Sequence, residues 1–218
     1  MVAVAGQVFK DTLADRAVQE NKWRSQQAAR PAITCENQSL INVYLFKYLG
    51  SIFAADGQEC FDVNARIAMA TKRCGQLSHI FDSPHIGPWL KIRLYAVAVC
   101  SLMTYGCESW TLTDKVQRRL NGANSKMLSH ITGNHVQTEE RRATTSFDII
   151  KHIKTMRIKW IGNILRDSNA HQRLIYSAIS LHNYSGSLLS DAPPHRNLEH
   201  LSELARDKAF WNEHIRHL

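Results

Sequence analysis

The chain has 218 residues, of which 44% are hydrophobic, and this is enough to bury the core of one full domain or of two small ones. Its formal net charge of +8 at pH 7, to which 11 histidines can add, favours a polyanionic partner such as nucleic acid, although many small basic proteins bind none. Secretion and membrane insertion are not expected, because no N-terminal stretch has the pattern of a signal peptide and the most apolar run, residues 94–103, is about half the length that crosses a bilayer.

The N-terminal part of the chain is polar first and strand-like afterwards. Residues 1–30 form an unassigned leader, in which a helix is plausible but no clear apolar stripe is present. From Ala32 onward, short strand-like runs alternate with turn-prone segments, and this predicts a small antiparallel β-hairpin over residues 31–58. The run at residues 43–53 has apolar side chains for both faces of a strand, as though another protein segment covered it.

Residues 59–133 have the spacing of helices. Apolar residues first recur every three or four positions at Val63, Ile67, Ala70, Cys74 and Leu77. This helix is expected to end before Pro84 and Pro88. The next helix, residues 89–105, is apolar almost all round and should be packed on more than one side, as the core of the chain. A third helix should begin after Thr113, a favourable capping residue.

The five cysteines are an odd number without a dense framework, which indicates a reducing compartment. Cys100 and Cys107 have no CxxC partner, and no histidine follows them at zinc-finger spacing. We therefore expect small buried hydrophobic residues here and no metal site. The protein should be intracellular and not secreted, with the nucleus and the cytoplasm both open.

A basic helical region is predicted for residues 134–180. Its clearest part is the amphipathic stretch 147–166, in which one arc holds Ile149, Ile153, Met156, Trp160 and Ile164. The opposite side holds Lys151, Lys154, Lys159 and Arg166. One face should pack and the other should be positive, either as a binding surface or as an ordinary solvated face. Residues 181–218 follow as a linker and a short terminal helix, which we expect to be weakly docked.

Several short blocks follow one another in a recognisable order. They are Phe46–Ser51, Asp56–Gly57, Val63–Ala68, Lys91–Tyr95, Tyr105–Thr113, Ile131–Gly133, Arg157–Arg166, Asp191–Pro193 and Ala205–Asp207. In this order they resemble the C-terminal part of LINE-type, non-LTR retrotransposon reverse transcriptases, which are RNA-directed DNA polymerases with an endonuclease. The resemblance covers about residues 33–216. It departs from the family at Asn163, where the family usually has a histidine.

The segment Phe53–Gly57 is close to the Phe-Ala-Asp-Asp signature of polymerases, but it is not expected to be catalytic. In the family the catalytic aspartate pair precedes the Lys-Tyr-Leu-Gly block, so the resemblance makes Asp56 a turn residue beside Gly57. Two-metal phosphoryl chemistry also needs at least two converging carboxylates, and the sequence contains no adjacent Asp pair. We expect no catalytic residue and no cofactor in this chain, and magnesium is implied only for the full-length parent.

The resemblance implies the end of a palm with its primer grip, a thumb-like helical bundle and a basic C-terminal region. The nucleic-acid contacts that it implies, together with the basic face, are Lys47, Tyr48, Leu49, Gly50, Lys91, Arg93, Lys151, Lys154, Lys159 and Arg166. For Tyr48 and Leu49, simple strand packing is an open alternative. Expected partners are an RNA–DNA or DNA duplex and the missing palm and fingers of the parent, and no small-molecule substrate is expected.

The sequence therefore predicts a mainly α fold, in which a small antiparallel β-hairpin precedes a thumb-like helical bundle and the C-terminal tail is only partly ordered. The predicted function is nucleic-acid binding by a fragment that has no polymerase activity of its own. The alternative is a retrotransposon-derived remnant that acts as a protein-interaction module or has no selected function. Salt dependence separates the two binding functions, because phosphate contacts weaken steeply with salt.

Overall fold

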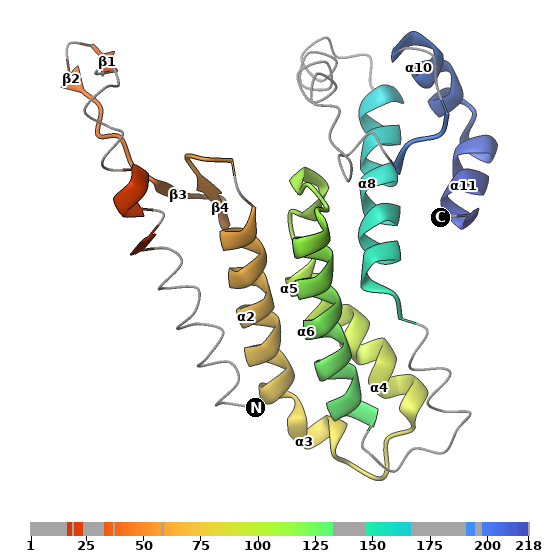
Figure 1. Ribbon diagram of the computed structural model, residues 1–218. Coiled ribbons are helices and arrows are strands. Elements are labelled where there is room, and N and C mark those ends of the chain that lie inside the picture. The colour runs from red at the N-terminus through yellow and green to blue at the C-terminus, as the bar shows by residue number, and fades with distance from the viewer. Residues whose placement is uncertain are drawn as a thin grey trace.

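The computed structural model describes residues 17–18, 20–23, 33–36, 38–57, 59–132, 147–166, 191–194 and 198–217 (Figure 1). Within these residues the protein is mainly helical, and two small antiparallel hairpins precede the helices, so the predicted fold class is confirmed. The leader and the linker-like segment lie mostly outside the described residues, and so do Arg141, Arg142 and Arg173 of the basic region.

Two hairpins occupy the segment in which one was predicted. β1 (Thr34–Cys35) pairs with β2 (Gln38–Ser39), and β3 (Leu45–Tyr48) pairs with β4 (Ser51–Ala54). The second hairpin turns at Leu49 and Gly50, whose φ angles of 47° and 85° are those of a type I′ turn. The prediction of one strand through residues 43–53 is therefore wrong. Asp56 does lie in a turn, as predicted, but in the one that follows β4.

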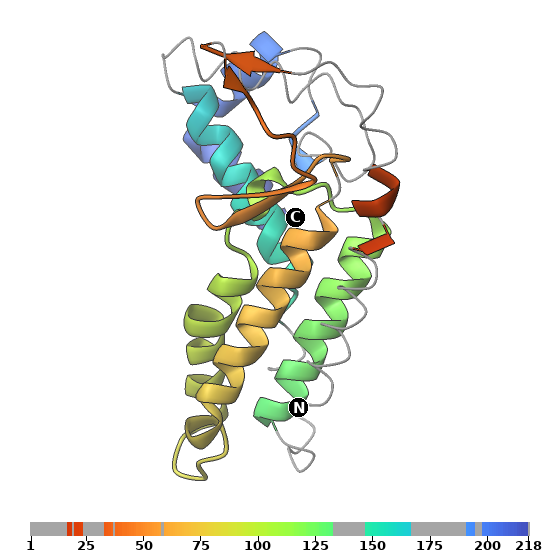
Figure 2. The same cartoon turned by 90° about the vertical axis from the view of Figure 1, so that its left-hand side faces the viewer.

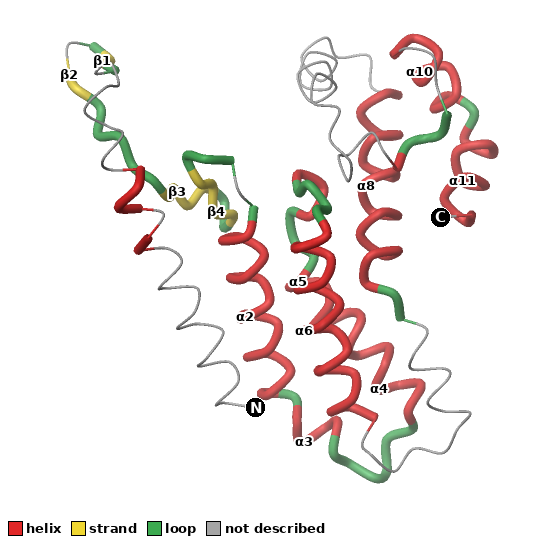
Figure 3. The backbone as a smooth tube through the Cα atoms, viewed as in Figure 1, coloured by secondary structure: helices red, strands yellow, loops and turns green. Residues whose placement is uncertain are grey.

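Helices form most of the remaining described chain (Figure 3). They are α2 (Cys60–Gln76), α3 (Ser78–Phe81), α4 (Pro88–Tyr95), the π-helical segment η1 (Ala96–Cys100), α5 (Ser101–Met103), the 3₁₀ turn η2 (Cys107–Ser109), α6 (Asp114–Thr132), α8 (Ile149–Arg166), α10 (Leu198–Arg206) and α11 (Lys208–His217). Pro88 begins α4 at a position where its missing N–H costs no helical hydrogen bond. Thr113 caps α6 as predicted, since its hydroxyl accepts a hydrogen bond from the backbone N–H of Val116 at 3.4 Å.

The first and larger hydrophobic cluster lies between α2, the helical run from α4 to α5, α6 and the first half of α8. Figure 2 shows α2 and α6 running side by side. The cluster includes Val63, Ala70, Cys74, Tyr95, Val99, Cys100, Met103, Cys107, Leu120, Ile149 and Ile153. Burial raises the pKa of the Cys74 thiol to about 11 and that of Cys100 to about 12, so both stay protonated. The expectation that Cys100 and Cys107 are buried is confirmed.

The helical run of residues 88–103 packs against both α2 and α6, as predicted, but it is not covered all round. One side of it carries Tyr95 and Met103 into the first cluster. The other side leaves Trp89 70% and Val97 69% exposed. An apolar side of a helix is buried only where a neighbouring segment covers it. No described residue covers the side that holds Trp89 and Val97 enough to bury these two side chains.

A second hydrophobic cluster joins the later half of α8 to α10 and α11. It includes Ile158, Ile161, Ile164, Leu165, Leu201, Ala205 and Trp211. Trp211 is only 2% exposed, and its indole N–H donates a hydrogen bond to the carbonyl oxygen of Ile158 at 3.0 Å. The expectation of a weakly docked terminal helix is therefore wrong for the described part of the tail. Because α8 packs in two directions, its buried arc is wider than predicted, and Trp160 lies at its partly exposed border.

Candidate nucleic-acid interface

The two faces of the β3–β4 hairpin have different surroundings. Side chains alternate between faces along a strand, so Leu45, Ile52 and Ala54 share one face. This face packs on a third cluster, formed by Trp23, Tyr44 and Phe61. The other face carries Phe46, Tyr48 and Phe53, which are 56%, 57% and 52% exposed. The hairpin is thus anchored on one side and leaves an aromatic surface open on the other.

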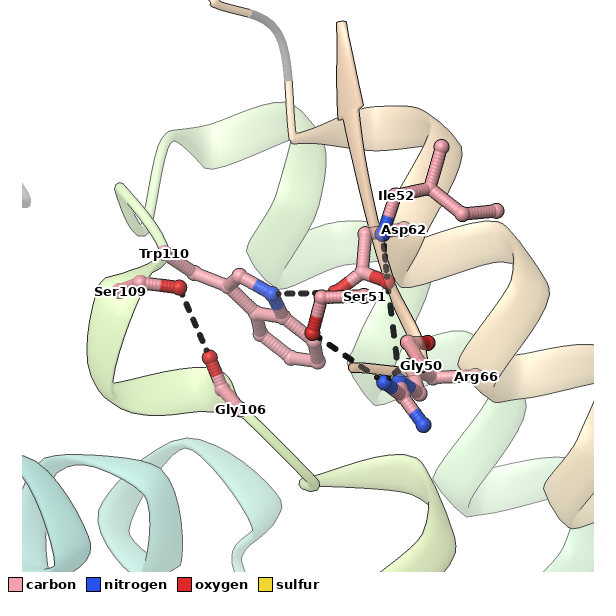
Figure 4. Close-up of polar contacts among 8 residues, drawn as sticks. All are labelled: Gly50, Ser51, Ile52, Asp62, Arg66, Gly106, Ser109 and Trp110. Atoms are coloured by element: carbon pink, nitrogen blue, oxygen red, sulfur yellow. Dashed lines mark hydrogen bonds and ion pairs between the residues drawn. The ribbon is translucent and has the colours of Figure 1, made fainter. Parts of the chain in front are cut away.

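Arg66 of α2 forms hydrogen bonds with the turn of this hairpin (Figure 4). Arg66 donates a hydrogen bond from Nη2 to the carbonyl oxygen of Gly50 at 2.6 Å, and a second one to the hydroxyl of Ser51 at 3.3 Å. Its guanidinium also lies over the ring of Tyr105, 4.5 Å from the centroid. Arg66 is only 5% exposed, so this cation serves the structure of the turn and is not offered to a ligand.

Asp62 of α2 is the second residue that fixes the hairpin to this helix. Its Oδ1 accepts a hydrogen bond from the backbone N–H of Ile52 at 3.0 Å, and its Oδ2 accepts one from the indole N–H of Trp110 at 3.0 Å. Asp62 lies in the first turn of α2, where the helix dipole favours an anion, and 3.7 Å separate its Oδ1 from Nε of Arg66. The sequence prediction did not include Asp62 or Arg66. The signal that could have found them is the i, i+4 spacing of opposite charges on a predicted helix.

Strand packing and contact with nucleic acid are the two interpretations of Tyr48 and Leu49, and the exposure of the turn bears on the first of them. Leu49 is 76% exposed, and the ring of Tyr48 is more than half exposed, so strand packing does not explain either side chain. Leu49 also has a left-handed backbone, which costs a non-glycine residue roughly 1–2 kcal/mol. Lys47 is exposed too, but as the neighbour of Tyr48 on the strand it points to the opposite face of the hairpin.

The cations predicted on α4 lie beside the exposed apolar side of that helix. The guanidinium of Arg93 lies over the indole of Trp89, 5.2 Å from the ring centroid, and both residues are exposed. Lys91 is partly buried. A cation over an aromatic face keeps its charge available to an anion while its position is restricted.

The four cations predicted on α8 are not equivalent. Lys151 and Lys159 are exposed. Lys154 instead forms an ion pair with Asp191, with 3.4 Å between Nζ and Oδ1. Arg166 donates hydrogen bonds to the carbonyl oxygen of Ala205 and to the side-chain oxygen of Asn163, both at 2.9 Å. Asn163 therefore orients a cation of its own helix.

Asp191 also pairs with Arg157, a cation that the helical pattern did not single out. Arg157 is completely buried on α8, and its Nη1 lies 2.9 Å from Oδ2 of Asp191. Burial lowers the pKa of Arg157, while the charge of Asp191 opposes this effect. The basic region thus uses two of its cations, Lys154 and Arg157, to hold a carboxylate from the tail.

The structure does not gather the predicted residues into one surface. Figure 1 shows the β3–β4 hairpin on the α2 side of the molecule and α8 on the other side, with α5 and α6 between them. The hairpin turn brings together Lys47, Tyr48, Leu49 and Gly50. The cations of α4 and those of α8 form separate groups on their own helices.

Among the described residues, no group of three or more His, Cys, Asp or Glu side chains is placed to hold a metal ion. No helix in the described part of the chain is long and apolar enough to span a membrane. No protein-family model, curated protein or solved structure matches the chain. The resemblance to reverse transcriptases therefore stays a prediction from the sequence blocks.

Proposed function

We propose that this chain binds nucleic acid through the turn of the β3–β4 hairpin, as the end of the palm and the thumb of a non-LTR retrotransposon reverse transcriptase, and that it has no polymerase activity of its own. One observation carries the proposal. The side chains of Tyr48 and Leu49 are exposed, while the backbone that carries them is fixed by Arg66 and Asp62. A rigid turn with exposed side chains loses little conformational entropy when it binds a ligand.

The charge of the hairpin supports a polyanionic ligand. Between Leu45 and Ala54 the only charged residue is Lys47. A phosphate backbone that passes the turn on the face of Lys47, opposite to that of Tyr48, therefore meets one cation and no carboxylate of the two strands. The exposed Lys151 and Lys159 of α8 supply a second positive group, on the other side of the bundle.

Fluorescence anisotropy with a labelled RNA–DNA hybrid tests the proposal. Between about 50 and 200 mM salt, the logarithm of the binding constant should fall linearly with the logarithm of the salt concentration, with a slope of about 0.9 per phosphate contact on B-form DNA. Lys47→Glu should weaken binding and flatten this slope. The double variant Lys151→Glu/Lys159→Glu tests the α8 group separately. Two unrelated duplexes of equal length should lose affinity in parallel, because backbone contacts carry no base information.

Matched controls come from exposed lysines outside the candidate groups. Lys126→Glu is the control for the single variant, and Lys126→Glu/Lys208→Glu is the control for the double variant. Each control changes the net charge by the same amount as its test variant. If controls and test variants weaken binding equally, the proposed contacts do not exist and only net charge matters. An absence of salt-dependent binding by the wild-type chain would overturn the proposal itself.

A protein-interaction module is the second candidate. It is favoured by the exposed apolar side of the α4–η1 run, which holds Trp89, Leu90 and Val97. A partner that docks on this surface should depend on Trp89 and respond weakly to salt, whereas the affinity for nucleic acid should respond steeply.

A further inference from the structure

One side of the helical run of residues 88–103 stays open among the described residues. Trp89, Arg93 and Val97 follow one another at a spacing of four residues, which places them along one side of a helix, and Leu90 lies beside them. Trp89, Leu90 and Val97 are 70%, 52% and 69% exposed, and Arg93 is exposed as well. We define these four residues as the α4–η1 surface.

The α4–η1 surface combines apolar side chains with a positive charge. Residues 83–107 contain Lys91 and Arg93 and no Asp or Glu. The guanidinium of Arg93 lies over the indole of Trp89, 5.2 Å from the ring centroid, so the charge lies among the exposed apolar side chains. Lys47 of the hairpin differs in this respect, because it points away from the exposed rings of its strand. A partner of the α4–η1 surface therefore needs apolar groups and a negative charge on the same side.

An irregular helical turn coincides with this surface. Val97 belongs to the π-helical segment η1. Its carbonyl oxygen accepts a hydrogen bond from the hydroxyl of Ser101, another exposed residue of the run, at 2.5 Å. Single π-helical turns within helices are rare and are found frequently at functional sites. The position of η1 is thus a second reason to expect a binding surface here.

The chemistry of the α4–η1 surface identifies the kind of occupant. Leu90 and Val97 need apolar contacts, which a phosphate backbone does not offer. The head groups of a bilayer form a layer apart from the acyl chains, whereas Arg93 lies between Trp89 and Val97. An amphipathic helix of a protein carries apolar residues and carboxylates three or four positions apart, which matches this row. Trp and Arg are also enriched among the residues that contribute most to the affinity of protein interfaces.

We propose that the α4–η1 surface binds an acidic, amphipathic helix of a partner protein. In the complex, apolar side chains of the partner cover Trp89, Leu90 and Val97, and a carboxylate of the partner pairs with Arg93. This inference rests on the second candidate function, the protein-interaction module, and names the chemistry of its partner. It does not depend on the binding of nucleic acid at the hairpin.

Selection of peptides on the whole folded chain tests the proposal. A phage-displayed library of random peptides of about 16 residues, long enough to form a helix, is selected on the wild-type chain. Peptides that still bind Trp89→Ser are then removed, and this step also removes those that respond only to net charge. The remaining peptides should have apolar residues at three- and four-residue spacing and more Asp and Glu than the unselected library.

A charge exchange then tests the contact with Arg93. By fluorescence anisotropy, a synthetic copy of a selected peptide should bind Arg93→Glu at least about tenfold more weakly than the wild-type chain. The same peptide with its carboxylates replaced by lysines should show the opposite order of affinity. Lys126→Glu, at an exposed position on α6, changes the net charge by the same amount and should affect both peptides much less. Circular dichroism checks that each variant is folded.

The inference is overturned if no peptide depends on Trp89, or if the dependent peptides carry no excess of carboxylates. Three further measurements then identify the occupant. A change of oligomeric state in Trp89→Ser would indicate a second copy of the chain, and sedimentation with phosphatidylserine vesicles that requires Trp89 would indicate a lipid surface. Weaker binding of an RNA–DNA duplex by Arg93→Glu would assign this cation to the proposed nucleic-acid function, which stands in that case. Conversely, a chain that binds acidic peptides and no duplex supports this inference and overturns only the nucleic-acid proposal.

Discussion

Arg157 and Asp191 form a buried ion pair that ties the tail of the chain to α8. Their side chains are 0% and 3% exposed, and 2.9 Å separate Nη1 from Oδ2. The backbone carbonyl oxygen of Asp191 also lies 3.1 Å from Nε2 of His214 on α11. One residue therefore connects α8 to α11 through both its side chain and its main chain.

Removal of the carboxylate should destabilise the fold strongly. Asp191→Asn leaves the buried guanidinium of Arg157 without its counter-charge, which should lower the free energy of unfolding by about 3–5 kcal/mol in urea denaturation. The double variant Arg157→Met/Asp191→Leu removes both charges and should recover most of this loss, because desolvation of a buried pair offsets much of its attraction. Asp82→Asn, at an exposed position, is the control and should change little. Equal losses in the single and double variants would contradict the assignment.

Because Trp211 packs directly on Gly162, the methyl group added by Gly162→Ala should have a strong effect on stability. A Cβ atom built on Gly162 would collide with the indole, including a 2.8 Å approach to Cε2. Gly162→Ala should therefore displace Trp211, break its hydrogen bond to Ile158 and lower stability by about 1–3 kcal/mol. Gly122→Ala on α6, where a Cβ atom meets nothing within 4 Å, should raise stability by about 0.5–1 kcal/mol. Thermal melts and tryptophan fluorescence measure both, and a stable Gly162→Ala protein would refute this packing.

The type I′ turn predicts opposite effects at two adjacent positions. Leu49→Asn should raise stability by about 1 kcal/mol, because Asn tolerates the left-handed backbone and the exposed leucine side chain loses little packing. Gly50→Ala should lower stability by about 1–2 kcal/mol. The cause is backbone strain and not crowding, since the nearest atom to a Cβ here is Nη2 of Arg66 at 3.7 Å. Urea denaturation checks both signs, and a destabilised Leu49→Asn protein would argue against this turn.

His152 predicts a pH dependence of stability. Burial and the nearby Lys159 lower its pKa below the ordinary value of 6.5. The unfolded chain therefore binds more protons than the folded chain between the lowered pKa and 6.5, so the free energy of unfolding falls as the pH drops through this window. His152→Gln should remove that part of the slope in denaturation curves measured across the window. His217→Gln, at an exposed position, should leave the slope unchanged, and a His152→Gln protein with the wild-type slope would show that this histidine does not titrate as described.

The isolated chain should incorporate no nucleotides on a primed RNA template with magnesium. The sequence has no adjacent pair of aspartates, and the carboxylate of Asp56 accepts a hydrogen bond from the hydroxyl of Tyr44 at 2.7 Å in a turn beyond β4. A primer-extension assay measures this. Incorporation that disappears in Asp56→Asn would assign that residue a catalytic role and overturn the prediction.

Local sequence patterns predicted the positions of the helices well, but they did not predict the turn of the β3–β4 hairpin. The spacing from Val63 to Leu77 identified α2, and Thr113 marked the start of α6, because periodicity and caps are properties of short segments. The turn at Leu49 was missed because leucine is an unusual residue for a left-handed position, and Asp56–Gly57 is a stronger turn signal.

Burial that depends on distant segments was not predictable from periodicity. Arg157 is buried because Asp191 reaches it from the tail, and a helical wheel of α8 contains no information about that partner. The exposure of Trp89 could not be predicted either. A helical pattern shows that this residue is apolar, but it does not show whether another segment covers it. For the candidate site, the block Lys47–Gly50 was identified from the sequence. Its anchors Asp62 and Arg66 were not, since their partners lie in the strands and in the loop that carries Trp110.

α8 belongs to both of the larger hydrophobic clusters. Ile149 and Ile153 pack in the first cluster, and Ile158 and Ile161 pack in the second. A continuous helix cannot lose order at one end without weakening the hydrogen bonds of the next turn, so melting of either cluster is transmitted to the other. The two clusters should therefore behave as a single cooperative unit, with a calorimetric enthalpy equal to the van 't Hoff enthalpy.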